Sequence, residues 1–316
     1  MNQTSLSSDV LDVAVCPDQG CDITSIVHRP TGCELLFRTP WGHSGRTHGA
    51  GPWAEDSATA WLDRYPGGWQ LLLPNAGPPC SVGGTEWVFH GEASQAAWSV
   101  TSHGDGRLEA ETVLCRAPLT VRRTIHVVGD EIRVTDDVTN VGTEDLDMVW
   151  GHHPAFGGDF VDSSTRLETT ATVFDADPAS PGTVLAPGAR SNWPHAVRVG
   201  GGSIDLSVLS DEGAGVSHLG YLSGFAEGSA RIVNQRRGLA VELSWPLDLM
   251  PHAWYWVENH ASTGYPWFGR CHVFAFEPCS TAAAVGMVDA VKRELGVVSI
   301  GPLQTRSATV ALSVRS

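Results

Sequence analysis

Basic residues are scarce in this sequence, and lysine is almost missing. Lysine occurs once, at Lys292, and 20 Lys and Arg stand against 35 Asp and Glu, for a formal net charge of −15. A surface with this sign of charge repels the phosphate groups of DNA and RNA. We therefore expect no nucleic acid among the partners of this protein.

Long apolar segments are missing as well. No uninterrupted apolar run approaches the roughly 20 residues that a membrane-spanning helix requires. The N-terminal segment MNQTSLSSDV has neither a basic patch nor an apolar stretch as long as that of a signal peptide. We expect a cytoplasmic protein with no membrane partner, either a monomer or a homodimer.

A zinc-binding cysteine pattern is also lacking. The seven cysteines include no Cys-x-x-Cys pair of the kind that holds zinc. We expect mostly structural thiols and no metal site. The apolar share of 42% is nevertheless large enough for a chain of this length to bury an extensive core.

The sequence also lacks long helical patterns, and its 35 Gly and 19 Pro are spread along the whole chain. Apolar and polar residues alternate on both sides of Gly129-Asp130 within Thr120–Asn140, which predicts an antiparallel hairpin, and the same alternation returns in Thr309–Val314. One helix is expected, over Thr281–Leu295. Further strands are expected at Asp12–Val15, Ile23–His28, Trp69–Leu73, Glu86–His90, Ala97–Ser102, Arg107–Leu114, Ile204–Ser210, Ala230–Asn234, Ala240–Trp245 and His272–Glu277.

Many short strands joined by Gly and Pro turns indicate two packed antiparallel sheets. The prediction is an all-β fold, a large antiparallel β-sandwich with few short helices, in a single domain over residues 1–316. The 12 Trp fit this fold in two ways. Their rings can fill the core between the sheets, or their flat faces can stack on sugar rings.

Four segments are rich in residues that can carry chemistry. In chain order they are Gly67–Gly77, His90-Gly91-Glu92-Ala93-Ser94, Trp150–Gly157 and Phe274–Pro278. None of them is specific when taken alone.

In this order, the segments resemble the aldose 1-epimerase (galactose mutarotase) superfamily. Gly67–Gly77 resembles the Gly-Gly, Phe-Pro, Gly stretch of its hexose-6-phosphate branch, and His90-Gly91 is similar to the His-Gly pair that follows. His153-Pro154-Ala155-Phe156 resembles the His-x-Tyr-Phe motif, with Ala155 in place of Tyr. Thr139–Gly142 and Phe276-Glu277-Pro278 resemble strand ends of the family, and the resemblance runs from about Asp12 to Val314.

The resemblance implies a galactose mutarotase-like supersandwich that binds a free sugar and interconverts its α and β anomers without a cofactor. It implies His153 as general acid and Glu277 as general base, with the roles exchanged when the ring closes again. Ring opening of a hemiacetal needs such a pair, because one proton is delivered to the ring oxygen while another leaves the C1 hydroxyl. A nearby carboxylate is expected to hold His153 protonated.

The resemblance implies His90 as a sugar ligand, and the aromatic segments Trp254–Asn259 and Tyr265–Phe268 suggest a stacking wall in which Glu258 or Asn259 bonds sugar hydroxyls. His90 is expected to hydrogen-bond a ring or C1 oxygen, Gln70 and Asn75 to act as polar ligands, and Trp256 to stack on the sugar. His152 is a further candidate, although side chains alternate along a strand and only one residue of the pair His152-His153 should face the substrate.

Three departures from the family leave the substrate and the reaction open. Pro66 and Ser94 stand where the sugar-phosphate branch has arginines, so Arg64 is the remaining candidate for an anionic group. Leu219–Gly224 contains no acid where the galactose branch has an aspartate. The alternatives to a mutarotase are a non-catalytic carbohydrate-binding protein and a different sugar epimerase or isomerase reaction in the same cleft.

Overall fold

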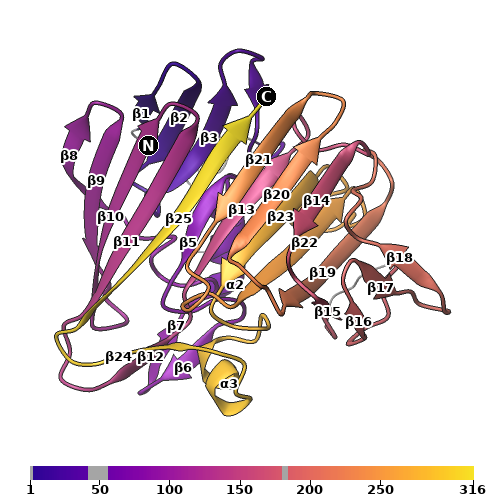
Figure 1. Cartoon of the computed structure of the whole chain (residues 1–316). Coiled ribbons are helices and arrows are strands. Elements are labelled where there is room, and N and C mark those ends of the chain that lie inside the picture. Colours follow the sequence, from indigo (N-terminus) through magenta and orange to yellow (C-terminus); the bar gives the residue numbers. More distant parts are fainter. Residues whose placement is uncertain (1–2, 42–55, 180–183) are drawn as a thin grey trace.

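Two antiparallel β-sheets packed face to face form most of the structure, a computed structural model that describes residues 3–41, 56–179 and 184–316 (Figure 1). This confirms the predicted β-sandwich. The first sheet has the order β1 (Thr4–Ser7), β2 (Leu11–Cys16), β3 (Asp22–His28), β5 (Trp69–Leu72), β13 (Gly151–Gly157), β23 (His272–Cys279), β22 (His252–Asn259), β19 (Val216–Ser223), β15 (Val173–Ala176) and β16 (Arg190–Asn192), with β4 (Cys33–Glu34) paired to β3.

The second sheet contains the hairpin that the alternation predicts. It has the order β14 (Thr165–Thr169), β20 (Ser229–Asn234), β21 (Leu239–Ser244), β25 (Thr305–Arg315), β11 (Glu131–Asn140), β10 (Leu119–Val128), β9 (Arg107–Val113) and β8 (Ser99–Gly104). Val127 pairs with Ile132 across the turn at Gly129-Asp130, and the predicted strand Thr309–Val314 lies within β25. The smaller pairs are β6 (Cys80–Val82) with β7 (Thr85–Trp87), β12 (Leu146–Met148) with β24 (Val298–Ile300), and β17 (His195–Val197) with β18 (Ser203–Asp205).

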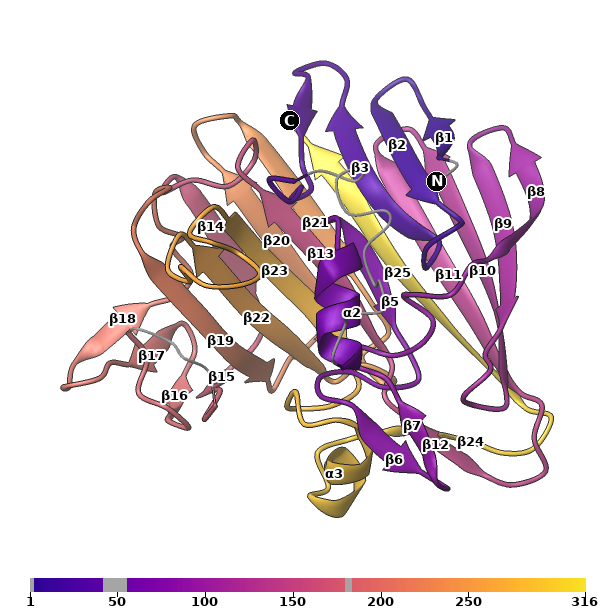
Figure 2. The same cartoon turned by 180° about the vertical axis from the view of Figure 1, so that it is seen from behind.

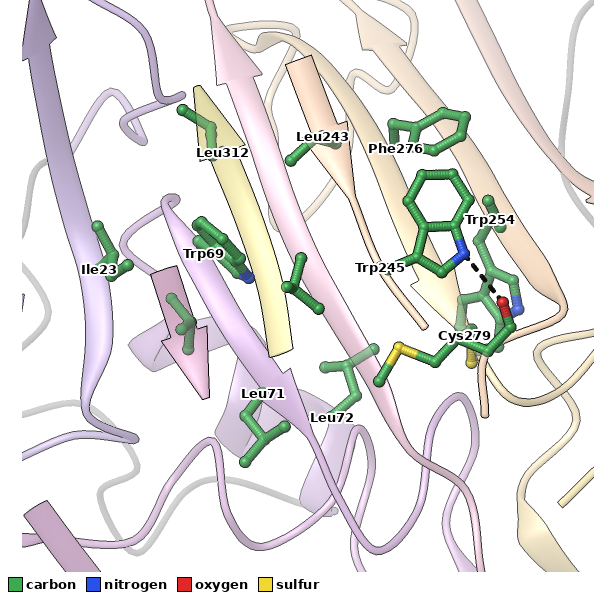
Figure 3. Packing of buried hydrophobic residues seen from close by; sticks show 14 of the residues in the cluster. Ile23, Trp69, Leu71, Leu72, Leu243, Trp245, Trp254, Phe276, Cys279 and Leu312 are labelled. Carbon is green, nitrogen blue, oxygen red and sulfur yellow. Dashed lines mark hydrogen bonds between the residues drawn. The ribbon is translucent and has the colours of Figure 1, made fainter. Parts of the chain in front are cut away.

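The core lies between the two sheets and packs aromatic side chains of the first sheet against aliphatic side chains of the second. Trp69 and Phe276 of the first sheet meet Leu243 and Leu312 of the second, and all four are buried (Figure 3). Trp245 joins this layer, and its Nε1 donates to the carbonyl of Met250 at 3.0 Å. Burial of such a side chain contributes roughly 1.5–3 kcal/mol, so this layer supplies the main driving force of folding.

A second, smaller apolar cluster lies on the other face of the first sheet. It joins side chains of β13 and β23 to Trp61 and Tyr65, which belong to the segment that begins with helix α2 (Ser57–Arg64). Figure 2 shows α2 lying across this face, opposite to the side covered by the second sheet. Helix α2 therefore covers part of this face.

The helices and two strands differ from the sequence prediction. The predicted helix Thr281–Leu295 is reduced to α3 (Met287–Lys292), because Gly286 has φ 77° and ends any helical path before Met287. Helix α2 was not predicted; it has eight residues, its N-cap Asp56 accepts from the backbone of Thr59, and its stability depends on packing rather than on pattern. The strands predicted at Glu86–His90 and Ile204–Ser210 end at Trp87 and Asp205.

In the part of the chain that the structure describes, no helix has the length and apolarity needed to cross a membrane.

Candidate active site

The register of the first sheet places His153 opposite Glu277. Strands β13 and β23 are antiparallel, with Gly151 paired to Cys279 and Ala155 paired to Ala275. His153 lies midway between these two pairs, as Glu277 does on the other strand, so both side chains leave the sheet on the same face. The imidazole Nε2 lies 3.6 Å from the carboxylate Oε1. Two motifs that lie far apart in the sequence therefore form one pair.

The pair lies in a cavity of about 410 Å³ on the outer face of the first sheet. Its walls are largely aromatic. The residues that line it are Trp61, Leu62, Tyr65, Gly77, Pro78, Phe89, His90, His153, Asp177, Ala179, Ser217, Leu219, Trp254, Trp256, Glu258, Ser262, Trp267, Glu277 and Ala284. The Trp256 ring lies 5.9 Å from the His153 ring and 5.5 Å from the Trp267 ring, so Trp256 reaches the place that the sequence predicts.

Burial controls the charge of the pair. Desolvation lowers the pKa of His153 to about 4. It also raises the pKa of Glu277 to about 8. At neutral pH the pair therefore holds one proton, and this proton is on the carboxyl group. The expectation that a carboxylate keeps His153 protonated is wrong, because burial disfavours the charged form of His153 as well as that of Glu277.

Two buried polar atoms of the pair have no protein partner among the described residues. They are Oε2 of Glu277 and Nδ1 of His153. Buried polar groups in native proteins are nearly always hydrogen-bonded. Since Glu277 and His153 are only 2% and 4% exposed, a bound polar molecule is the natural partner of these atoms.

His90 adds a second imidazole to the cavity wall. Its Nδ1 accepts from the backbone N–H of Gly77 at 3.2 Å, so in the neutral ring the proton is on Nε2. Burial, and secondly the neighbouring His153, hold the pKa of His90 well below its usual value. The turn needs Gly91, with φ 81°, because a Cβ there would lie 2.3 Å from the Leu73 carbonyl oxygen. The His-Gly pair thus presents one N–H donor.

His152 faces away from this cavity. Its Nδ1 accepts from Nε1 of Trp69 at 3.1 Å, and its Nε2 lies 3.4 Å from a carboxylate oxygen of Asp136, inside the sandwich. There Asp136 forms a buried ion pair with Arg123 at 2.7 Å. The prediction that His152 binds the substrate is therefore wrong, since strand alternation sends it into the core while His153 faces the cavity.

Gln70 and Arg64 also lie outside the cavity. Nε2 of Gln70 donates to the Gly67 carbonyl at 2.7 Å and to the Asp22 carboxylate at 3.2 Å. Arg64 ends α2 and lies with Gln70 and Asp22 behind the wall that Trp61 and Tyr65 form. In this structure neither residue contacts the space in front of His153.

Asn75 connects neighbouring segments of the chain by hydrogen bonds and is not placed to bind a sugar. Its amide nitrogen donates to the carbonyls of Pro78 and Val88, at 2.9 and 3.0 Å. Its amide oxygen accepts from the backbone N–H of Met287 at 2.7 Å. The side chain thereby joins three segments beside the cavity, which leaves none of its hydrogen-bonding groups for a ligand.

The cavity wall also contains residues that are not among the site residues expected from the sequence. Trp61 is in α2 and Tyr65 directly follows it, and this helix carries no clear periodic signal. Asp177 directly follows β15 in a segment without a motif. Trp254, Trp267 and Glu258 stand in the aromatic segments of the expected stacking wall, whose period-2 alternation gave each residue two possible faces. Among the described residues, no group of three or more His, Cys, Asp or Glu is placed to hold a metal ion.

Comparison with known proteins gives a family and a fold. The family model described as "Domain of unknown function (DUF4432)" matches residues 3–186. A search of curated proteins found no match.

Solved structures match over nearly the whole chain. The Slr1438 protein of Synechocystis sp. PCC 6803 is 16% identical with a TM-score of 0.72, and the match covers 99% of this chain and 95% of that one. An Escherichia coli K12 protein, assigned provisionally as an aldose 1-epimerase, is 21% identical with a TM-score of 0.69, covering 99% of both chains. A galactose mutarotase related enzyme of Lactobacillus acidophilus is 14% identical with a TM-score of 0.67, covering 100% and 98%. At these identities the likeness establishes a shared fold.

Proposed function

Since the chain belongs to the family described as Domain of unknown function (DUF4432) and shares the fold of galactose mutarotase-like structures, we propose that it is an aldose 1-epimerase that interconverts the α and β anomers of a free aldose. The observation that carries this proposal is the pair His153–Glu277, held at 3.6 Å in an aromatic cavity and sharing one proton at neutral pH.

The charge of the pair suits both halves of the reaction. In ring opening, protonated Glu277 donates to the ring oxygen as the bond from this oxygen to C1 breaks, and His153 takes the proton of the C1 hydroxyl. The open-chain aldehyde rotates about the C1–C2 bond. In ring closure, the C5 hydroxyl attacks the other face of the carbonyl and returns its proton to Glu277, while His153 protonates the carbonyl oxygen. The pair ends in its starting state, and no redox step occurs.

The resting proton reverses the roles that the family resemblance implies. There His153 acts first as the acid, whereas burial in this cavity gives the proton to Glu277. Each residue serves as acid in one half of the cycle and as base in the other, so the same pair supports both directions.

The other walls of the cavity support binding of a sugar ring. Trp256 offers a flat apolar face next to His153, and sugar C–H groups stack on such faces. His90 offers one N–H donor, and a fixed donor of this kind holds a sugar oxygen in position for proton transfer.

The test is exchange NMR of anomeric protons across a panel of free aldoses. The wild type should accelerate exchange for at least one of them, and His153→Ala and Glu277→Gln should each lower the rate by about 10²–10⁴-fold. His195→Ala, which changes an exposed histidine on β17, is the control and should retain the wild-type rate. Binding of a sugar without accelerated exchange, unaltered by His153→Ala, would refute the proposal and identify a carbohydrate-binding protein.

A further inference from the structure

Two further carboxylates line the cavity on strands beyond the catalytic pair. Glu258 is on β22, two residues past Trp256 and paired with Ser217 of β19. Asp177 extends β15, and its backbone N–H donates to the Leu219 carbonyl at 2.9 Å. In the sheet order, β15 is separated from β23 by β22 and β19. Asp177 and Glu258 therefore face a part of a bound ligand that lies away from the reacting carbon.

Asp177 is held as an acceptor. One carboxylate oxygen accepts from the backbone N–H of Ala179 at 2.7 Å, and the other accepts from the hydroxyl of Tyr221. Burial, and secondly Asp177 itself, raise the pKa of Tyr221, so this hydroxyl keeps its proton and stays a donor. Among the described residues, both of these contacts come from hydrogen-bond donors, so the carboxylate acts as an acceptor.

Glu258 has the same character. Its Oε1 accepts from the backbone N–H groups of Ala261 and Ser262 at 2.8 and 2.9 Å, and its Oε2 accepts from the Ser262 hydroxyl at 2.6 Å. The side chain is 1% exposed and lines the cavity. These bonds fix the carboxylate in place and leave one lone pair, on Oε2, for a ligand.

No positive side chain balances these acids among the described residues that line the cavity. The two histidines are neutral at physiological pH, since burial lowers both of their pKa values. Arg64 lies behind the wall of Trp61 and Tyr65, next to Asp22. In the same cavity, Oε2 of buried Glu277 has no hydrogen-bond partner among the described residues.

We propose that Asp177 and Glu258 select the substrate by charge: they accept hydrogen bonds from hydroxyl or ammonium groups of a neutral or amino aldose, and they exclude aldoses that carry a phosphate, sulfonate or carboxylate. This inference rests on the proposed function for the identity of the ligand as a sugar. Charge repulsion by either carboxylate should lower the affinity for an anionic sugar by about 100-fold.

The experiment measures binding by calorimetry and anomer exchange by NMR in parallel. The probes are glucose, galactose, glucosamine, galactosamine, glucuronate, galacturonate and the two hexose 6-phosphates. The variants are Asp177→Asn and Glu258→Gln, whose amide groups can keep most of the hydrogen bonds described above. Asp175→Asn is the matched control, because Asp175 is on the same strand but pairs with Arg190 at 3.0 Å and does not line the cavity.

For the wild type we expect at least about 100-fold weaker binding and lower kcat/KM for the acidic sugars than for their neutral counterparts. Asp177→Asn or Glu258→Gln should reduce this difference in affinity between neutral and acidic sugars at least tenfold, and Asp175→Asn should leave the difference unchanged. Tighter binding of the amino sugars would identify an ammonium ligand, and equal binding a hydroxyl ligand.

Failure of the two proposals can be told apart. If no sugar shows accelerated exchange but neutral or amino sugars still bind in preference to acidic ones, the proposed function fails and the charge selection stands. If exchange is accelerated but acidic sugars bind as well as neutral ones, or if neither cavity variant reduces the difference in affinity, the charge selection is overturned. Binding of no sugar at all overturns both.

Discussion

Replacing Glu277 with glutamine should stabilise the protein at neutral and alkaline pH while it removes a catalytic proton. Burial raises the pKa of this carboxyl from 4.5 to about 8 in the folded protein. Between these two values the folded chain holds a proton that the unfolded chain releases, so the free energy of unfolding of the wild type falls as the pH rises through this window. Glutamine is neutral in both states and resembles the protonated acid.

The expected gain follows from the two pKa values. One pKa unit corresponds to about 1.4 kcal/mol, so Glu277→Gln should be more stable than the wild type by about 3 kcal/mol at pH 7 and by almost nothing near pH 4.5. For a chain of 316 residues, about 3 kcal/mol at pH 7 corresponds to a rise in Tm of about 5 °C.

The assay is thermal unfolding of wild type and variant, followed by circular dichroism at pH values from 5 to 9. Glu258→Gln is the control, because donors surround that carboxylate on both oxygens. Losing the charge there should cost about 1 kcal/mol and give no gain at any pH. A Glu277→Gln variant that is less stable than the wild type at pH 8, or a difference that does not change with pH, would refute the reasoning.

Three further predictions concern the pair His153–Glu277, the buried ion pair Arg123–Asp136 and the N–H donor of His90. The kcat/KM for anomer exchange should not change with pH between about pH 4, below which His153 becomes protonated, and about pH 8, above which Glu277 loses its proton. A fall in kcat/KM that begins near pH 6.5 on the alkaline side would contradict this. Arg123→Met should lower the free energy of unfolding by about 3–5 kcal/mol, because it leaves Asp136 buried without its ion-pair partner. Chemical denaturation should show that the double variant Arg123→Met/Asp136→Leu regains part of the lost free energy of unfolding. His90→Phe should keep the aromatic contacts and lower kcat/KM by about 10–100-fold through loss of one hydrogen bond, and an unchanged kcat/KM in the kinetic assay would exclude His90 as a ligand.

The sandwich could be predicted because its strands follow local rules. The alternation around Gly129-Asp130 specifies a hairpin on its own, and β10 and β11 form with that turn. Helix α2 could not be predicted, since its eight residues are stabilised by packing of Trp61 against the first sheet rather than by helical pattern. A helix this short is marginal without such contacts.

The candidate site was predictable in part for a similar reason. The motifs indicated the pair His153–Glu277, and the sheet register then brings the two side chains together. The uses of Gln70 and Asn75 depend on where neighbouring carbonyls lie, which no local pattern encodes. Asp177 comes from an unmarked strand end, and only the order of strands in the sheet brings it to the cavity.

The two faces of β13 limit which changes in chain length this protein can tolerate. His152 is locked into the core next to Asp136, and its neighbour His153 faces the cavity. A one-residue insertion or deletion in this strand would exchange the two environments and damage folding and chemistry together. Asp177, by contrast, directly follows β15 and keeps one backbone hydrogen bond to β19, so fewer ladder bonds constrain its position. Descendants of this sequence can therefore acquire new substrates through such strand ends while β13 stays invariant in length.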